Sequence, residues 1–565
     1  MNPAVDKPKE SRWSPTSLVP QKVAGWFRGY TNPLGYSELK DHRHKEYDAQ
    51  ELQYPFLQRV TASKTLQRLL ASIFSLILPS FYHRNSNQSS YKVTPTSWLD
   101  GLRGIACFIV FMYHYFYAYF ETRGVAFEFN NKDSVNHYIL QLPLIRIVHS
   151  GRSMVSIFFV ISGFALSHKV VMLTRGAKPQ SAVERSHAIL SNLTSSVWRR
   201  HLRLFLPLIG TYLLVTVFVS AGWFETVPWG EKGWLTGNVE FRPARESSLW
   251  SQLASAAKEY YKVAGPVTLF RGWVYPDYIS VYDSHLWTIP EEFHQSMLLF
   301  LVMTGLCHLK RWVRVYIFLP AIVVSTMCNG YWAMSLFIFG YFVAEIHAEV
   351  VAARESALEP KLPGGGVYSP IQGSEAGRRR RELSRTVFVT VAFLGGLYLC
   401  SFPETLPPEK STTGFTTLSR SAPKRYGGGD ACGFWMHTGA ELLVFSIVFL
   451  PAVQDILCWK VFQYLGRISF ALYLVHGTTN RSIGYALVHW GWRVTGASAM
   501  WADKAAPDQM GAGLLESSRV AVVLLVFLVN VPITIWMSDI FWRVFDLPSV
   551  KFVRWLESKL ARAVN

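Results

Sequence analysis

The chain has 565 residues, of which 50% are hydrophobic and 15% aromatic, and a formal net charge of +18. This composition, together with several apolar runs near bilayer length, predicts a polytopic membrane protein and argues against a soluble one. The positive charge does not indicate nucleic-acid binding, because the basic residues gather where the cytosolic loops of a membrane protein carry them.

Residues 1–96 are predicted to form a cytosolic N-terminal extension. The first 65 residues are polar, charged and contain proline, so they show no secretory signal and are expected to be disordered. Residues 65–82 are apolar, but Arg68 interrupts the run and Pro79 ends it. We expect an interfacial helix there, with an additional membrane span as the alternative.

The first predicted membrane span covers residues 99–120 and carries Arg103 and His114. At about 100° per residue, the spacing of these two residues places both side chains on one face of a helix. Titratable side chains inside a membrane are costly and usually line a functional cavity. The alternative is that Arg103 extends to the interface while His114 belongs to an aromatic belt.

Nine further spans are predicted, at residues 145–168, 202–222, 286–308, 312–328, 331–348, 386–403, 437–457, 460–479 and 519–542. Segments 169–203 and 349–385 and the tail after Arg543 are basic. Basic segments favour the cytosol, and with ten spans all of these segments and both termini lie on the cytosolic side. The expected host is an endomembrane or the plasma membrane. The prediction is an all-α transmembrane bundle over residues 97–545, with a cytosolic linker at 349–385 and a cytosolic tail at 546–565.

Two polar motifs accompany the second and third predicted spans. Ser162 and Gly163 allow either close helix packing or a local break whose backbone groups contact a ligand. Arg200 and Arg203 share a helical face, and their guanidinium groups suit phosphate oxygens. Ordinary positive-inside anchoring is the alternative for these arginines.

The fourth predicted span begins near Glu291 and Glu292, which point to different helical faces, so at most one is expected to point at a given partner. A general preference for acidic residues at helix N-termini is the alternative. A later span carries Arg467 at one end and His476 near the other, where interfacial anchoring is again an alternative. The six cysteines form no paired motif, so we expect neither a disulfide framework nor a metal site.

Six motifs occur in the order Leu99-Asp-Gly-Leu-Arg-Gly104, Arg103-x10-His114, Phe158-Phe-Val-Ile-Ser-Gly163, Arg200-x-x-Arg203, Trp287-Thr-Ile-x-x-Glu292 and Gly466-Arg-Ile-Ser-Phe-Ala-Leu-Tyr-Leu-Val-His476. Together they resemble the acyltransferase-3 family of integral-membrane O-acyltransferases, in particular its fungal-type branch. The resemblance covers about residues 97–545.

This resemblance implies about ten transmembrane helices and an enzyme that moves an acyl group, often acetyl, from acyl-CoA to a hydroxyl. Acyl-CoA is then a co-substrate, and no bound cofactor is expected. The resemblance implies His114 as the catalytic histidine, supported by Arg103. It places the functional carboxylate at Glu292, with Glu291 as the open alternative. Donor binding is assigned to Arg200, Arg203, Ser162 and Gly163.

An imidazole titrates near neutral pH, so His114 is expected to accept the proton of the acceptor hydroxyl as its oxygen attacks the thioester. An acyl-histidine intermediate is the alternative. We expect Glu292 to fix the tautomer of His114, as the carboxylate of a catalytic triad does. The donor phosphates are expected near Arg200 and Arg203, on the cytosolic side, with His114 about 16 Å deeper along its helix than Arg103.

The expected acceptor is a small molecule, such as a secondary metabolite, because no extracytoplasmic glycan-handling segment is recognised in the sequence. A glycan or a lipid is the alternative within the same family. A proton-coupled transporter is the competing class of protein, since carriers also use intramembrane Arg, His and Glu residues. No pair of Gly/Pro-broken spans in corresponding halves supports that class.

Overall fold

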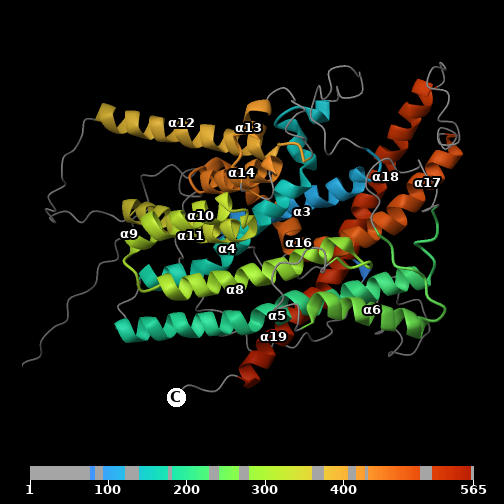
Figure 1. The fold of residues 1–565 in the computed structure, drawn as a ribbon, viewed down its shortest axis with the longest axis horizontal. Coiled ribbons are helices and arrows are strands. Elements are labelled where there is room, and N and C mark those ends of the chain that lie inside the picture. Colours follow the sequence, from blue (N-terminus) through green and yellow to red (C-terminus); the bar gives the residue numbers. More distant parts are fainter. Residues whose placement is uncertain are drawn as a thin grey trace, which may run out of the picture. The chain divides into compact units, whose positions relative to one another are not determined.

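A computed structural model describes residues 75, 77–82, 93–120, 139–175, 181–227, 241–265, 279–358, 375–404, 415–424, 426, 430–496 and 512–560. Regular structure among these residues is helical throughout, which confirms the predicted all-α class (Figure 1). The chain divides into two units, Met1–Thr96 and Ser97–Asn565. The first includes a short 3-10 helix, η3 (Ser80–Tyr82), and most of the predicted extension and interfacial helix lies outside the described residues.

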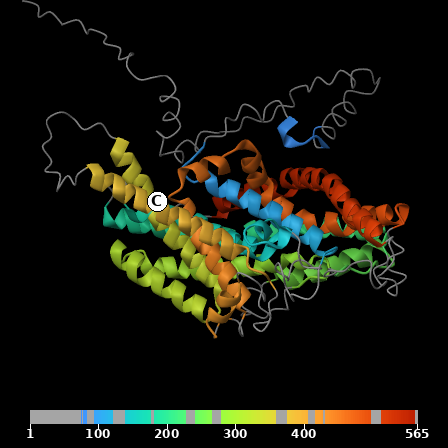
Figure 2. The same ribbon diagram turned by 90° about the horizontal axis from the view of Figure 1, so that it is seen from above.

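The second unit contains long helices joined by short helical segments and loops (Figure 2). Its elements in chain order are α3 (Ser97–Tyr117), η6 (Ile139–Gln141), η7 (Ile145–His149), α4 (Gly151–Arg175), α5 (Ala182–Ser220), α6 (Leu249–Ala264), η8 (Ser284–Trp287), α8 (Thr288–Leu306), α9 (Arg311–Val313), η9 (Arg314–Phe318), α10 (Leu319–Cys328), α11 (Trp332–Leu358), α12 (Glu375–Cys400), α13 (Thr416–Ser421), α14 (Ala431–Ile447), α15 (Pro451–Leu457), α16 (Lys460–Thr479), η10 (Asn480–Gly484), α17 (Tyr485–Val494), α18 (Ala512–Phe541), η12 (Trp542–Asp546) and α19 (Leu547–Leu560).

Six helical segments among the described residues are long and apolar enough to cross a membrane, compared with about ten predicted spans. These segments are Gly151–Arg175, Ala182–Ser220, Arg311–Cys328, Trp332–Glu355, Glu382–Cys400 and Ser517–Leu560. Helices α3, α8 and α16 lie where spans were predicted but are not in this set. Each of the three carries several polar or titratable side chains, which lower its mean hydropathy.

The basic segment 169–203, expected to be a loop, is largely helical. Helix α4 continues to Arg175, and α5 already begins at Ala182. A capping box explains this start, because the backbone N–H of Glu184 donates to Ser181 Oγ at 3.1 Å while Ser181 N–H donates to Glu184 Oε2 at 2.9 Å. The third predicted span is therefore only the second half of a much longer helix.

The predicted span at 437–457 is broken. Helix α14 ends at Ile447 and α15 begins at Pro451, with an angle of 100° between them, and counting this bent pair as one span gives seven. Leu450 precedes the proline and has φ −113° and ψ 84°, because the proline ring disfavours a helical residue before it. The segment between the predicted spans at 460–479 and 519–542 contains η10 and α17, and the predicted tail 546–565 contains α19.

Helix α3 packs closely along α16, and α4 packs along α11 (Figure 1). Between α3 and α16, Arg103 Nη2 donates to the carbonyl oxygen of Gly466 at 2.8 Å, and Cys107 Sγ donates to that of Ser469 at 3.0 Å. All six cysteines lie in the described part of the chain and are free, as expected. The α3–α16 contact brings together two of the sequence motifs that lie furthest apart in the chain.

Candidate active site

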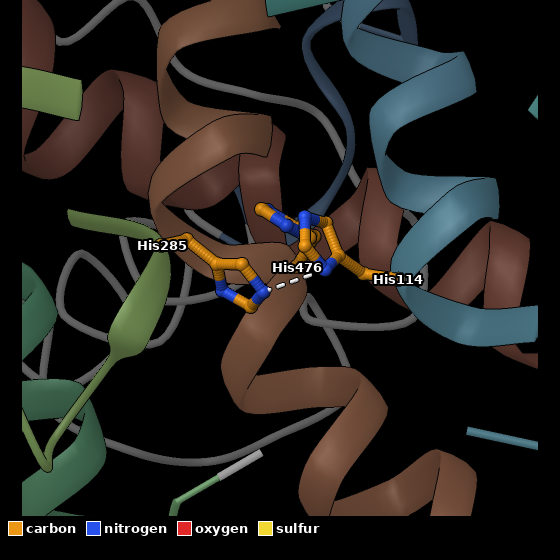
Figure 3. A group of neighbouring side chains, drawn as sticks. All are labelled: His114, His285 and His476. Carbon is orange, nitrogen blue, oxygen red and sulfur yellow. Dashed lines mark hydrogen bonds between the residues drawn. The ribbon is translucent and has the colours of Figure 1, made fainter. Parts of the chain in front are cut away.

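Three histidines from separate elements converge inside the second unit: His114 of α3, His285 of η8 and His476 of α16 (Figure 3). His285 Nε2 lies 2.9 Å from His114 Nδ1, a hydrogen-bonding distance. The ring of His476 is centred 5.3 Å from that of His114 and 4.6 Å from that of His285. His285 and His476 are buried, and His114 is half-buried. We call these three residues the histidine cluster.

A buried carboxylate extends the cluster. His285 Nδ1 donates to Asp283 Oδ1 at 2.7 Å, and the backbone N–H of His285 donates to the same oxygen at 3.0 Å. Arg481 Nη2 lies 3.7 Å from the other carboxylate oxygen and also donates to the carbonyl of Tyr282 at 2.7 Å. Burial by itself raises the pKa of Asp283, but the neighbouring His285 and Arg481 lower it to about 2. Asp283 is therefore an ionised acceptor.

The direction of these hydrogen bonds fixes the tautomers of two rings. A carboxylate only accepts, so neutral His285 carries its proton on Nδ1 and accepts at Nε2. His114 must then donate from Nδ1 to reach His285, which places its lone pair on Nε2. The chain Asp283–His285–His114 thus presents a proton-accepting nitrogen at its end, as an oriented general base requires.

Helix α16 holds His285 in place from the other side. The hydroxyl of Tyr473 donates to the carbonyl oxygen of His285, and Thr288 Oγ1 lies 2.6 Å from that hydroxyl. A Cβ atom at Gly477 would lie 2.7 Å from His285 Nδ1 and 2.8 Å from Asp283 Oδ2. Only glycine at this position lets the Asp283–His285 pair approach the helix so closely.

Three of the predicted site residues meet elsewhere, between α4, α5 and α8. Arg200 Nη2 donates to Glu292 Oε1 at 2.7 Å, and Ser162 Oγ donates to the same oxygen at 2.9 Å. Arg200 Nε also donates to Ser296 Oγ at 2.8 Å. We call Ser162, Arg200, Glu292 and Ser296 the Glu292 cluster. Its largely buried ion pair joins α5 and α8, and the Ser162 hydrogen bond adds α4.

Glu292 was expected to fix the tautomer of His114, and the structure gives that position to His285. The carboxylate of Glu292 is bonded to Arg200 and Ser162 instead. The neighbouring Glu291 accepts a hydrogen bond from Gln295 Nε2 at 2.8 Å. The two acids have different partners because consecutive residues point to different faces of α8.

The remaining predicted residues lie outside both clusters. Arg103 bonds to the Gly466 carbonyl and lies 3.1 Å from Asp100. Arg203 pairs with Asp546 of η12. Gly163 serves helix packing, because a Cβ atom there would lie 2.1 Å from the carbonyl oxygen of Phe337 in α11.

Four residues around His114 were not predicted as site residues: Asp283, His285, His476 and Arg481. His285 lies two residues before the motif Trp287-Thr-Ile-x-x-Glu292, and His476 ends another motif, where interfacial anchoring was one alternative. A useful signal was available in Asp283-x-His285, since a carboxylate two residues before a histidine is well placed to hold its ring.

A family model described as an acyltransferase domain matches residues 96–539 of the chain. The chain is 28% identical over 516 residues to the O-acetyltransferase PaAT-1 of Phomopsis amygdali, covering 89% of this chain and 93% of that protein. It is 28% identical to the acyltransferase clz18 of Cochliobolus lunatus and 27% identical to the acyltransferase R4 of a Phoma species, each match covering 71% of this chain and 86% of the relative. No solved structure matches the chain.

Proposed function

The chain belongs to the acyltransferase-3 family, and from that premise we propose that it is a membrane-embedded O-acyltransferase that uses acyl-CoA and a histidine base. Acyl transfer is the activity named for its relatives. The observation that supports a histidine base is the chain of hydrogen bonds from Asp283 through His285 to His114. It orients an imidazole as a proton acceptor inside a helical bundle.

In the proposed reaction, His114 Nε2 takes the proton of the acceptor hydroxyl while the hydroxyl oxygen attacks the thioester carbonyl. The new ester bond forms, the C–S bond breaks, and the CoA thiolate leaves with the proton returned by His114. Asp283 stabilises the transient imidazolium through His285, because a fixed negative charge lies at the other end of the chain. Direct attack by His114 on the thioester, giving an acyl-histidine, is the alternative path.

For the donor, we propose that the CoA phosphates bind on the cytosolic side at Arg203 rather than at Arg200. The Arg200 side chain is 13% exposed and its charge is paired with Glu292, whereas that of Arg203 is 37% exposed. A guanidinium group with that exposure is better placed to exchange its partner for a phosphate. The assignment assumes the proposed topology of ten spans and cytosolic termini. In that topology the CoA phosphates stay on the cytosolic side and the thioester extends into the bundle to reach His114.

We propose acetyl as the transferred group, supported by the name of the O-acetyltransferase relative, and a small hydroxylated molecule as the acceptor. The test is a transfer assay with purified full-length protein, labelled acetyl-CoA and a panel of hydroxylated small molecules, glycans and lipids. Free CoA and a labelled ester are expected in equal amounts, and only with an acceptor. Absence of acceptor-dependent CoA release across the panel and across acyl chain lengths would contradict the proposal.

A further inference from the structure

The histidine cluster also has the composition of a metal site. One ring nitrogen from each of His114, His285 and His476 can be chosen so that the three lie within 4.8 Å of one another. Figure 3 shows the three side chains close together, reaching one another from separate elements. Imidazole nitrogen is a preferred ligand for Zn²⁺, Cu²⁺ and Ni²⁺. The cysteine pattern had led us to expect no metal site, and this arrangement comes from histidines that no sequence spacing connects.

Two of the rings are held as metal-binding histidines usually are. His285 donates its Nδ1 proton to Asp283, and His476 Nδ1 lies 2.7 Å from the carbonyl oxygen of Tyr473 and 3.2 Å from that of Leu472. Since carboxylate and carbonyl oxygens only accept, both neutral rings keep their proton on Nδ1 and a lone pair on Nε2. Such contacts from the second ring nitrogen orient a histidine toward a metal and raise its basicity.

The surrounding structure also limits how these rings move. Arg481 lies beside the Asp283 carboxylate, and Tyr473 bonds to the backbone of His285. Gly477 leaves room for Asp283 and His285 to approach α16 closely. His285 and His476 are 4% and 1% exposed. The nitrogen donors are therefore preorganised, which lowers the cost of assembling them around an ion.

We propose that His114 Nδ1, His285 Nε2 and His476 Nε2 bind a divalent transition-metal ion of the Zn²⁺ class, and that the bound ion inhibits acyl transfer. Zn–N bonds of about 2.0–2.1 Å in a tetrahedral site place the ligand nitrogens roughly 3.3 Å apart. The pair now separated by 2.9 Å has to open by only a few tenths of an ångström. The third nitrogen lies within 4.8 Å of the other two, so the His476 ring has to move inward as the ion binds.

Inhibition follows from where the single ring proton of His114 lies when the ion is bound, and this part rests on the proposed function. Neutral His114 carries one proton, on Nδ1, and the ion takes that nitrogen, so the proton moves to Nε2. No proton is lost, but Nε2 now donates and no longer accepts the proton of the acceptor hydroxyl. If His114 is an imidazolium when the ion arrives, one proton is released to solvent.

The binding test uses full-length protein in detergent, first treated with a chelator. Zn²⁺ is titrated by equilibrium dialysis, and Co²⁺ is followed by its visible absorption, which reports coordination geometry. We expect one ion per chain and an affinity at least about tenfold weaker in His476→Gln, which removes one ligand. His168→Gln is the matched control, because His168 stacks on Phe164 in α4, outside the cluster, and should bind as the unaltered protein does.

Equal Zn²⁺ affinity in His476→Gln, His285→Gln and the unaltered protein would overturn the proposed site. A variant that fails to fold is recognised by loss of helical circular dichroism, and the second variant then decides. Chelator-treated enzyme should be fully active and Zn²⁺ should inhibit it; activity lost on chelation and restored by Zn²⁺ would overturn the inhibitory role. Binding is measured without turnover, so failure of the proposed function, seen as no transfer by the metal-free enzyme, remains distinguishable.

Discussion

Two clusters of buried polar side chains lie between the helices, and they differ in how their hydrogen bonds end. At the histidine cluster, His285 bonds to Asp283 and to His114, and the chain of hydrogen bonds ends at the His114 ring, the proposed base. In the Glu292 cluster, a carboxylate and a guanidinium neutralise each other and a hydroxyl completes the contact.

This difference suits one cluster to proton transfer and the other to holding helices together. A chain of imidazoles can take up a proton and release it near neutral pH while its hydrogen bonds persist. A buried ion pair has no such freedom, because a change of charge on one partner leaves the other uncompensated. Under the proposed function, the histidine cluster transfers the proton, whereas the Glu292 cluster joins α4, α5 and α8. Three substitutions test this division, and a fourth tests the proposed donor contact.

The largest effect is expected for His114→Ala, which removes the proposed base. The turnover number should fall by about 10³-fold or more, since a positioned general base contributes roughly 10² to 10⁴ and the alternative nucleophile would be lost as well. Thermal unfolding monitored by circular dichroism should change little, because the ring is half-buried. His168→Ala is the control, and near-normal turnover in His114→Ala would end the assignment.

The second effect is expected for Asp283→Asn, which keeps the size of the side chain and removes its charge. The carboxamide can donate to His285 and reverse both tautomers, so Nε2 of His114 would carry a proton; we expect kcat about 10²-fold lower. The apparent pKa in the pH profile of kcat/KM should also fall, because the imidazolium loses its counter-charge.

Asp539→Asn controls for the loss of any buried Asp–Arg pair, since Asp539 lies 2.8 Å from Arg543 Nε and is fully buried. It should lower stability without moving the pH profile. If both variants shift the profile alike, Asp283 has a structural role only.

A smaller and different effect is expected for Glu292→Gln. The side chains of Arg200 and Glu292 are 13% and 22% exposed, so the substitution leaves a largely buried guanidinium without its counter-charge. We expect a free energy of unfolding lower by about 2 kcal/mol, with kcat changed only a few-fold. Glu441→Gln is the control, because Glu441 accepts a hydrogen bond from Ser335 Oγ that a carboxamide oxygen retains. A loss of kcat matching that of His114→Ala, at unchanged stability, would return Glu292 to the catalytic chemistry.

The smallest effect on turnover is expected for Arg203→Ala. The Arg203 side chain is 37% exposed but its partner Asp546 is buried, so the substitution leaves a buried carboxylate without its counter-charge and should lower the free energy of unfolding. As the proposed phosphate contact, however, Arg203 should matter for the donor, and its loss should raise the KM for acetyl-CoA several-fold with kcat unchanged. Arg199→Ala, which breaks the neighbouring pair with Glu557, is the matched variant. Equal KM values in the two variants would argue against donor binding at Arg203.

The sequence by itself determined the family, the all-helical class and the placement of the helix that carries His114. These follow from local patterns, since apolar length, helical periodicity and motif order are all properties of continuous segments. The same reasoning set several boundaries wrongly. A capping box extends α5 to Ala182, and Pro451 breaks the span at 437–457, so local signals of helix start and stop outweighed average hydropathy.

Only the tertiary structure decided which polar residues meet. From the sequence, Glu292 was as reasonable a partner for His114 as any, but it projects toward Arg200 and Ser162 from one face of α8. His285 lies in η8, just before α8 begins, and the absence of a side chain at Gly477 lets its ring approach α16 and reach His114. Such contacts join residues far apart in the chain, and they depend on helix rotation and side-chain direction, which no single segment encodes.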